Sequence, residues 1–278
     1  RIGIIVSVSV CVAFAALVVI AFGYLGYDLP SAEFFAIFVP AASIVLVGRA
    51  ASIELQASRA CKALERYLSP ELLEQIIESG AELDLSTRRR ELTVVFVDIQ
   101  GFSTISETVD VEYINRMLND FFERMTKAIF EHKGTIDKFL GDGLLAFFGD
   151  PIPLENHALA AVKASLAMQE QMRQLNAQYA SSGIPEFQKG IWLRIGVNTG
   201  LIIVGNVGSS RRLEYTVLGS TVNIASRLQS LAPPGGVIMT ARTRGMVKDE
   251  IESDGPDIVK VKGIDRGIEV YRIYPQSE

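Results

Sequence analysis

The chain has 278 residues, 49% of them hydrophobic, which suffices for one sizeable globular domain and a more apolar segment besides. A net charge of -5 at pH 7, with no basic cluster larger than the three arginines at 88–90, argues against a nucleic-acid-binding surface, which needs a concentrated positive face. The two cysteines, Cys11 and Cys61, are too few and too scattered for a disulfide framework or a zinc site, and they fit a reducing compartment.

The first apolar segment, residues 2–23, contains no charged side chain and is predicted to be a transmembrane helix. At about 1.5 Å per residue it would reach about 33 Å, enough to cross a hydrocarbon core of about 30 Å. A cleaved signal peptide is the alternative, although its apolar core usually has only ~7 to 15 residues. Because the sequence opens with Arg1 and not with methionine, we expect it to continue from an upstream segment, such as a sensor domain.

A second apolar stretch, residues 34–47, is shorter and contains Pro40, so a core helix, a re-entrant segment and a tilted span all remain open. We predict a second span over about residues 30–48. The connection before it carries acidic residues and the segment after it carries basic ones: Asp28 and Glu33 against Arg49, Arg59, Lys62 and Arg66. By the positive-inside rule, this asymmetry predicts an inner or plasma membrane protein whose chain is cytoplasmic after Arg49.

Residues 49–90 are predicted to form a helical linker. Small and apolar residues recur there at alternating steps of four and three, the heptad spacing of a two-stranded coiled coil: Ile53, Ala57, Ala60, Leu64 and Tyr67. Two heptads are short and alanine packs weakly, so an ordinary amphipathic helix is an equal alternative. Ser69-Pro70 then indicates the start of a short helix that Gly80 ends.

Over residues 91–278, short β-type runs alternate with helical ones. We expect, in chain order, a strand over 93–98, a helix over 111–132, two strands around a turn at 141–143 and a helix over 154–179. Strands 193–197 and 201–206 are expected to form a hairpin around Asn198-Thr199-Gly200, before a helix over 221–229 and strands near 237, 258 and 270. This order predicts an α+β domain with one helical layer on one antiparallel-rich sheet.

Two aspartates lie at predicted strand ends beside glycines. Asp98 ends the run Val-Val-Phe-Val-Asp, and Asp142 lies in the turn Phe-Leu-Gly-Asp-Gly. Mg²⁺ keeps several ligands from water and phosphate, so two carboxylates suffice, and two ions about 3.5 to 4 Å apart can flank one phosphorus atom. Aspartates are also common turn residues, so the residues alone leave both interpretations open.

Four segments of the chain together resemble the class III nucleotidyl cyclase catalytic domain. In chain order they are Phe96 to Phe102, Asp137 to Asp142, Arg194 to Gly200 and Tyr215 to Arg227. Each segment alone is a weak signal, but the four occur in the family's order and spacing, and the resemblance runs from about residue 91 to 274. It implies a ferredoxin-like α+β fold with active sites between two domains packed head to tail.

The resemblance also implies the site residues. Asp98, Asp142 and the backbone carbonyl of Ile99 match the ligands of two Mg²⁺ ions per active site, which Mn²⁺ can replace. Asn223 and Arg227 match the pair that orients the ribose and stabilises the transition state at the α-phosphate. A fixed guanidinium suits that role, because negative charge grows on the α-phosphoryl oxygens during the attack of the ribose 3′-oxygen.

Lys138 and Thr216 match the residues that recognise the base. Adenine offers an acceptor at N1 and a donor at its 6-amino group, whereas guanine offers the reverse at both places. An ammonium only donates and a hydroxyl can accept, so the pair suits adenine. Many adenylate-forming relatives carry aspartate where this chain has Thr216, so the chain resembles a threonine-bearing subgroup. A hydroxyl can also donate, which leaves the discrimination mainly to Lys138.

Arg194 and Lys262 match the cations that hold the triphosphate. All of these roles are filled within one chain, so we expect a homodimer with two equivalent sites. One chain would hold the metals and bind the triphosphate. The other chain would recognise the base and supply Asn223 and Arg227. The chain is thus predicted to be a membrane-anchored adenylate cyclase acting on ATP. The alternatives are a guanylate cyclase, which Lys138 disfavours, and a catalytically silent regulatory domain, which would usually lack some of these residues.

Overall fold

The computed structural model describes residues 86–209, 212–263 and 266–274, together with residues 20, 47–49 and 52. The chain divides into two compact units, Arg1–Arg66 and Tyr67–Glu278, and all elements from β1 to β8 lie in the second. Almost all of the predicted spans at 2–23 and 30–48, and the linker over 53–85, lie outside the described residues and stay predictions. No helix in the described part of the chain is long and apolar enough to cross a membrane.

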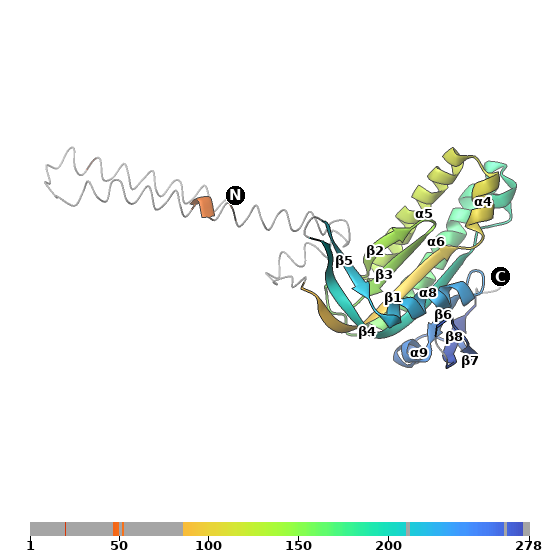
Figure 1. The fold of residues 1–278 in the computed structure, drawn as a ribbon. Coiled ribbons are helices and arrows are strands. Elements are labelled where there is room, and N and C mark those ends of the chain that lie inside the picture. The colour runs from red at the N-terminus through yellow and green to blue at the C-terminus, as the bar shows by residue number, and fades with distance from the viewer. Residues whose placement is uncertain are drawn as a thin grey trace. The chain divides into compact units, whose positions relative to one another are not determined.

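The second unit contains an α+β domain whose elements follow the predicted order, strand, helix, two strands, helix, strand (Figure 1). The strands are β1 (Arg88–Ile99), β2 (Thr135–Leu140), β3 (Gly143–Phe148), β4 (Leu193–Ser209), β5 (Arg212–Leu218), β6 (Val237–Thr240), β7 (Asp254–Val259) and β8 (Ile268–Ile273). The helices are α4 (Phe102–Thr108), α5 (Val111–Glu131), α6 (His157–Tyr179), α7 (Pro185–Gln188), α8 (Ser220–Leu231) and α9 (Ala241–Val247), with a 3-10 turn at Ala180–Ser182. The predicted helices over 111–132, 154–179 and 221–229 are confirmed within a few residues.

The strands form one sheet in the order β2-β3-β1-β4-β6-β8-β7, with β5 paired to β4. Among the described strands only β4 and β6 pair in parallel. Val95 and Val97 of β1 face a core shared with α5 and α6, whereas Val94 and Phe96 face a second core shared with β5 and α8. Helices therefore pack on both faces of the sheet, and the predicted single helical layer is wrong. Because side chains alternate along a strand, Asp98 belongs to the face of Val94 and Phe96.

The hairpin predicted around Asn198-Thr199-Gly200 is wrong, because Leu193–Ser209 forms one continuous strand, β4, which pairs with β1 along this stretch. Small and polar residues are needed here for packing and not for a turn. A Cβ on Gly200 would lie 2.8 Å from Thr221 Oγ1 of α8, and Asn198 Nδ2 donates to the Thr221 carbonyl oxygen at 2.8 Å. β4 instead forms its hairpin with β5.

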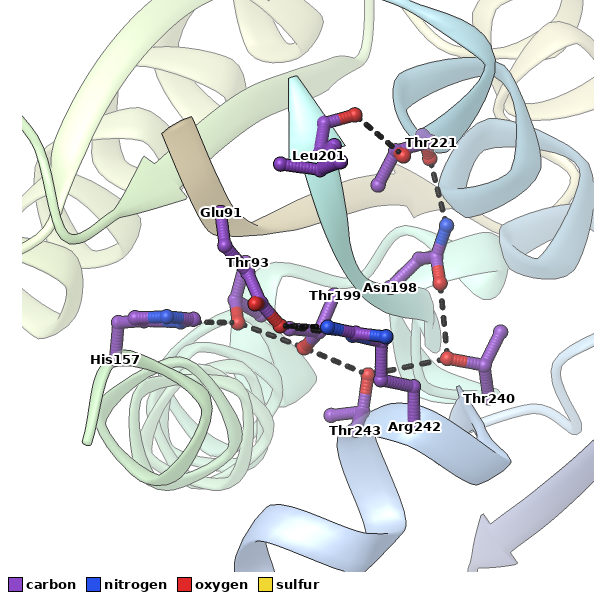
Figure 2. Close-up of polar contacts among 10 residues, drawn as sticks. All are labelled: Glu91, Thr93, His157, Asn198, Thr199, Leu201, Thr221, Thr240, Arg242 and Thr243. Carbon is purple, nitrogen blue, oxygen red and sulfur yellow. Dashed lines mark hydrogen bonds and ion pairs between the residues drawn. The ribbon is translucent and has the colours of Figure 1, made fainter. Parts of the chain in front are cut away.

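A buried polar network joins the sheet to the surrounding helices (Figure 2). It connects β1, β4, β6, α6, α8 and α9 through Thr93, His157, Asn198, Thr199, Thr221, Thr240 and Thr243. Asn198 is its link to α8, since its Oδ1 accepts from the Thr240 hydroxyl at 2.8 Å while its Nδ2 donates to Thr221. Buried polar groups that satisfy one another favour a single arrangement. The network therefore holds α8, which carries Asn223 and Arg227, in place on β4.

Gly196 gives a test of how closely α8 must pack. A Cβ there would lie 2.3 Å from the Ala225 carbonyl oxygen and 2.4 Å from the Gln229 nitrogen. Both are backbone atoms, so we expect Gly196→Ala to displace α8 and to lower the free energy of unfolding by about 1 to 3 kcal/mol, measured by urea titration. Gly245→Ala is the matched control, because a Cβ there meets nothing within 4 Å. Equal stability of the two variants would contradict the close packing.

Asp150, which is 2% exposed, ties the start of β1 to β5. Arg88 Nη2 donates to the two carboxylate oxygens at 3.2 and 2.9 Å, and the Tyr215 hydroxyl donates to Oδ1. Burial, together with the Asp150 carboxylate, raises the pKa of Tyr215, which keeps this hydroxyl a donor. Because Tyr215 directly precedes Thr216, the cluster also fixes the part of β5 that carries the predicted base-recognition residue.

Candidate active site

Asp98 and Asp142 lie side by side at one end of the sheet. Asp98 is the next-to-last residue of β1, and Asp142 lies in the turn between β2 and β3. Gly143 stands opposite Asp98, and a Cβ there would lie 2.3 Å from the Val97 carbonyl oxygen, so glycine permits the close approach. Asp142 directly precedes Gly143 in the chain, so its carboxyl group lies near that of Asp98. Ile99, whose side chain is buried, follows directly. The structure thus brings the predicted metal ligands together.

The charges around this pair favour a bound cation. Burial, and after it the negative charge of Asp98, raises the pKa of Asp142, while Arg194 opposes the rise. Arg194 stands opposite Asp98 in the pairing of β4 with β1, and its Nη2 lies 2.9 Å from Asp98 Oδ2. Gln229 Nε2 donates to the same oxygen at 3.1 Å. Adjacent carboxylates that resist ionising together gain from a divalent ion, which relieves their repulsion.

The donor set suits Mg²⁺. As predicted from the sequence, it would consist of two carboxylates and the backbone carbonyl of Ile99, all oxygen ligands. Within the described ranges, no group of three or more His, Cys, Asp or Glu side chains could hold a metal. An ion at Asp98 and Asp142 would therefore take its other ligands from water and phosphate, as Mg²⁺ at nucleotide sites does.

Asp142→Asn is expected to raise the thermal midpoint of the metal-free protein at neutral pH. The pKa of Asp142 is higher in the folded than in the unfolded chain, so the folded chain binds more protons between the two values and stability falls as pH rises through that window. Asparagine cannot ionise, so the variant does not lose stability as pH rises through this window. Melting curves in EDTA from about pH 3 to pH 8 measure the gain, which should vanish below pH 3.8, the ordinary pKa of an aspartic acid side chain.

The matched comparison is the effect of Mg²⁺ on the same melting curves. Added Mg²⁺ should raise the midpoint of the wild-type chain more than that of Asp142→Asn, because only the wild type keeps both carboxylates. A metal-free midpoint at neutral pH that is equal or lower in the variant would contradict the repulsion at this site.

Lys138 and Thr216 line one pocket of about 410 Å³, a size within the ~300 to 1,000 Å³ typical of small-molecule sites. The other lining residues are Val207, Gly208, Ser209, Glu214 and Leu218. Lys138 Nζ lies 3.2 Å from Asp137 Oδ1 and 3.5 Å from Glu214 Oε2. Partial burial lowers the pKa of Lys138, but these two carboxylates outweigh it and raise the pKa above its ordinary value. The ammonium therefore stays a donor at physiological pH.

Asn223 and Arg227 lie four residues apart on α8, which puts them on the same side of the helix. Asn223 is exposed and Arg227 is half-buried. A Cβ on Gly263 would lie 3.6 Å from both terminal nitrogens of Arg227, so the turn that carries the exposed Lys262 lies beside Arg227. The sequence grouped Lys262 with Arg194, whereas the structure puts the turn of Lys262 next to Arg227.

Three residues that the structure places at these sites are absent from the predicted set: Asp137, Glu214 and Gln229. Strict alternation along a strand would point the side chains of Asp137 and Lys138 to opposite faces. β2 carries a bulge between Ile136 and Lys138, however, and a bulge re-aims side chains. The only local signal is the opposite charge of two adjacent residues, Asp137 and Lys138. Gln229 has no such signal, because its partner Asp98 is far away in the sequence.

Comparison with known proteins agrees with this geometry. Residues 85–274 match the family model described as the adenylate and guanylate cyclase catalytic domain. Adenylate cyclase 1 of Rhizobium meliloti (strain 1021) is 34% identical over 209 residues, covering 74% of this chain and 31% of the relative, so the chain spans about a third of that protein's length.

Solved structures of both adenylyl and guanylyl cyclases are similar. The adenylyl cyclase CyaB from P. aeruginosa has a TM-score of 0.66 and 37% identity, covering 69% of this chain and 98% of that one. The guanylyl cyclase Cya2 has a TM-score of 0.63 and 33% identity, covering 67% of this chain and 92% of that one. Similarity to both kinds leaves the choice of base to the pocket residues. This chain belongs to the adenylate and guanylate cyclase catalytic domain family.

Proposed function

We propose that this chain is an adenylate cyclase, which converts ATP to 3′,5′-cyclic AMP and pyrophosphate. The observation that carries the proposal is the placement of Asp98 opposite Gly143, which puts Asp98 and Asp142 side by side, because adjacent carboxylates at strand ends can hold the Mg²⁺ that accompanies a triphosphate. Similarity to proteins named adenylate cyclase supports it.

The residues at the metal site and on α8 have separate roles in this proposal. Asp98, Asp142 and the Ile99 carbonyl would hold two Mg²⁺ ions, or Mn²⁺ in their place. When bound, such ions supply positive charge at the attacking oxygen and at the departing pyrophosphate. Arg227 would stabilise the charge that grows on the α-phosphoryl oxygens, because its guanidinium is already in place, and Asn223 would orient the ribose.

The pocket of Lys138 and Thr216 would select adenine. Lys138 can only donate, so it suits the acceptor N1 of adenine and disfavours the N1–H donor of guanine. Thr216 would accept a hydrogen bond from the adenine 6-amino group, as in the threonine-bearing subgroup that the sequence resembles. Arg194 and Lys262 would bind the triphosphate.

We further propose that two copies of the chain share each site. Asp98, Asp142 and Arg194 would come from one copy. The other copy would supply the base pocket and α8, with Lys138, Thr216, Asn223, Arg227 and Lys262. The predicted spans at 2–23 and 30–48 would anchor this homodimer in the inner or plasma membrane with the catalytic domain in the cytoplasm, and an upstream sensor would act through the linker. The charge asymmetry around the second span supports this orientation.

Turnover by the purified chain tests the proposed activity. With Mg²⁺ we expect cyclic AMP from ATP and much less cyclic GMP from GTP. Arg227→Ala is the matched control, since it leaves both carboxylates intact but should lose about 10² to 10³ in kcat. Preferential formation of cyclic GMP would contradict the choice of base. Absence of turnover with Mg²⁺ and with Mn²⁺ would instead indicate a silent regulatory domain.

A further inference from the structure

Asp137 is a buried carboxylate next to two residues that line the pocket, Lys138 and Thr216. It is 5% exposed, and Thr216 beside it is 6% exposed. The Thr216 hydroxyl donates to Asp137 Oδ2 at 2.6 Å, and the Val217 backbone N–H donates to the same oxygen at 3.1 Å. The other carboxylate oxygen, Oδ1, lies 3.2 Å from Lys138 Nζ. One side chain thus contacts both residues of the predicted base-recognition pair.

These contacts settle where the Thr216 proton lies. A backbone N–H can only donate, so Asp137 Oδ2 is an acceptor toward Val217. The neighbour of the other oxygen, Oδ1, is the ammonium of Lys138, which also has only protons to donate, so both carboxylate oxygens face donors. The short contact between Thr216 and Oδ2 is therefore a hydrogen bond from the hydroxyl to the carboxylate.

A hydroxyl has one proton and two lone pairs. With its proton committed to Asp137, Thr216 presents only lone pairs to the pocket. Such a group accepts from the 6-amino group of adenine and repels the carbonyl oxygen that guanine carries at the same position. A freely rotating hydroxyl would serve either base, since it could turn its proton toward the guanine oxygen.

We propose that Asp137 is a specificity-determining positioning residue, which makes Thr216 a fixed hydrogen-bond acceptor and thereby adds a second point of discrimination against guanine. The proposal rests on the proposed function, because it concerns the base of the same nucleotide. It gives the pocket two complementary partners for adenine, a fixed donor in Lys138 and a fixed acceptor in Thr216.

The bulge in β2 is what makes this possible. Between Ile136 and Lys138 the pairing with β3 advances by one residue on β3 and two on β2, so Asp137 is the extra residue. An inserted residue lets consecutive side chains approach one site. Asp137 can therefore reach Thr216 on β5 while Lys138, next to it, lines the same pocket.

A double-mutant cycle tests the proposal. The ratio of kcat/KM for ATP to that for GTP is measured for the wild-type chain, Asp137→Ala, Thr216→Val and the double variant. We expect each single substitution to lower the ratio by about tenfold, the size of one hydrogen bond, and the double substitution to lower it no further than Thr216→Val alone. A partly unfolded variant would show lower kcat/KM values for ATP and for GTP by the same factor, so the ratio of the two does not depend on the folded fraction. An unchanged ratio in Asp137→Ala, or additive effects in the double variant, would overturn the proposal.

Asp137→Asn separates the orientation of Thr216 from the charge beside Lys138. Its amide oxygen must still face the Val217 N–H and so still accept from Thr216, but the negative charge is gone. We expect this variant to keep a ratio near that of the wild type. If its ratio falls as far as that of Asp137→Ala, the effect runs through Lys138 and the orienting role is refuted.

Nucleotide binding keeps the test independent of turnover. Competition of ATP and GTP against a fluorescent ATP analogue, in Ca²⁺ or Mg²⁺, gives the dissociation constant of each nucleotide. The ratio of the dissociation constant for GTP to that for ATP is then compared among the four chains of the cycle. A wild-type chain that binds but does not turn over would refute the proposed activity, and the binding ratios would still decide the role of Asp137. Equal binding ratios in the wild type and Asp137→Ala would refute that role even if the wild type makes cyclic AMP.

Discussion

Mixing Asp98→Ala chains with Asn223→Ala chains is expected to restore cyclase activity that neither chain has alone. Asp98 lies beside Asp142 and Arg194 at the predicted metal site, whereas Asn223 is an exposed residue of α8. If each site takes one half from each copy, a mixed dimer contains one site with both substitutions and one site with neither. Random pairing at equal amounts then gives about a quarter of the wild-type activity, measured as cyclic AMP per mole of chain.

The control for this experiment is a chain that carries both substitutions. Mixing it with Asp98→Ala should give no recovery, because every site then lacks Asp98. Asp98→Ala also leaves Arg194 and Gln229 without their shared acceptor, so melting curves must show that the variant is folded. Folded variants that fail to complement each other would mean that each chain builds its site alone, contrary to the shared-site proposal.

Much of the fold was predictable because its signals are local. Alternating apolar residues mark the strand over 93–98, the turn at 141–143 separates β2 from β3, and long helical patterns mark α5 and α6. β4 was not predictable in this way. Asn198 and Gly200 have the chemistry of turn residues, but their roles depend on Thr221 and Thr240, more than twenty residues away in the sequence. Tertiary packing overrides local propensity where a helix must lie close to a strand.

The motifs that contain Asp98 and Asp142 predicted a metal pair, and the structure places the two residues side by side at one end of the sheet. The neighbour of Lys262 could not be predicted, because it depends on how the turn at Gly263 meets Arg227.

The orientation of the Thr216 hydroxyl was hidden for a related reason. A threonine in a sequence has no defined proton direction, and the bulge that brings Asp137 to it leaves no local signal. The sequence therefore left the choice of base mainly to Lys138, whereas the structure adds the hydrogen bond from Thr216 to Asp137.

A Lys138→Glu chain is expected to lose at least about a hundredfold in kcat/KM for ATP without becoming an efficient guanylate cyclase. Glutamate matches the N1–H of guanine, but here it would join the carboxylates of Asp137 and Glu214, which now lie 3.2 and 3.5 Å from the lysine nitrogen. Thr216, still held as an acceptor, would also continue to face the guanine carbonyl oxygen.

Adding Glu214→Gln to Lys138→Glu tests this explanation, because it removes one of the two opposing charges. We expect the double variant to turn over GTP several-fold faster than Lys138→Glu alone, and further substitution of Asp137 by alanine to add to this gain by freeing the Thr216 hydroxyl. Lys138→Met is the control for loss of the donor without a new charge. If Lys138→Glu alone used GTP as well as the wild type uses ATP, one residue would determine the base, and neither the surrounding carboxylates nor the orientation of Thr216 would matter for specificity.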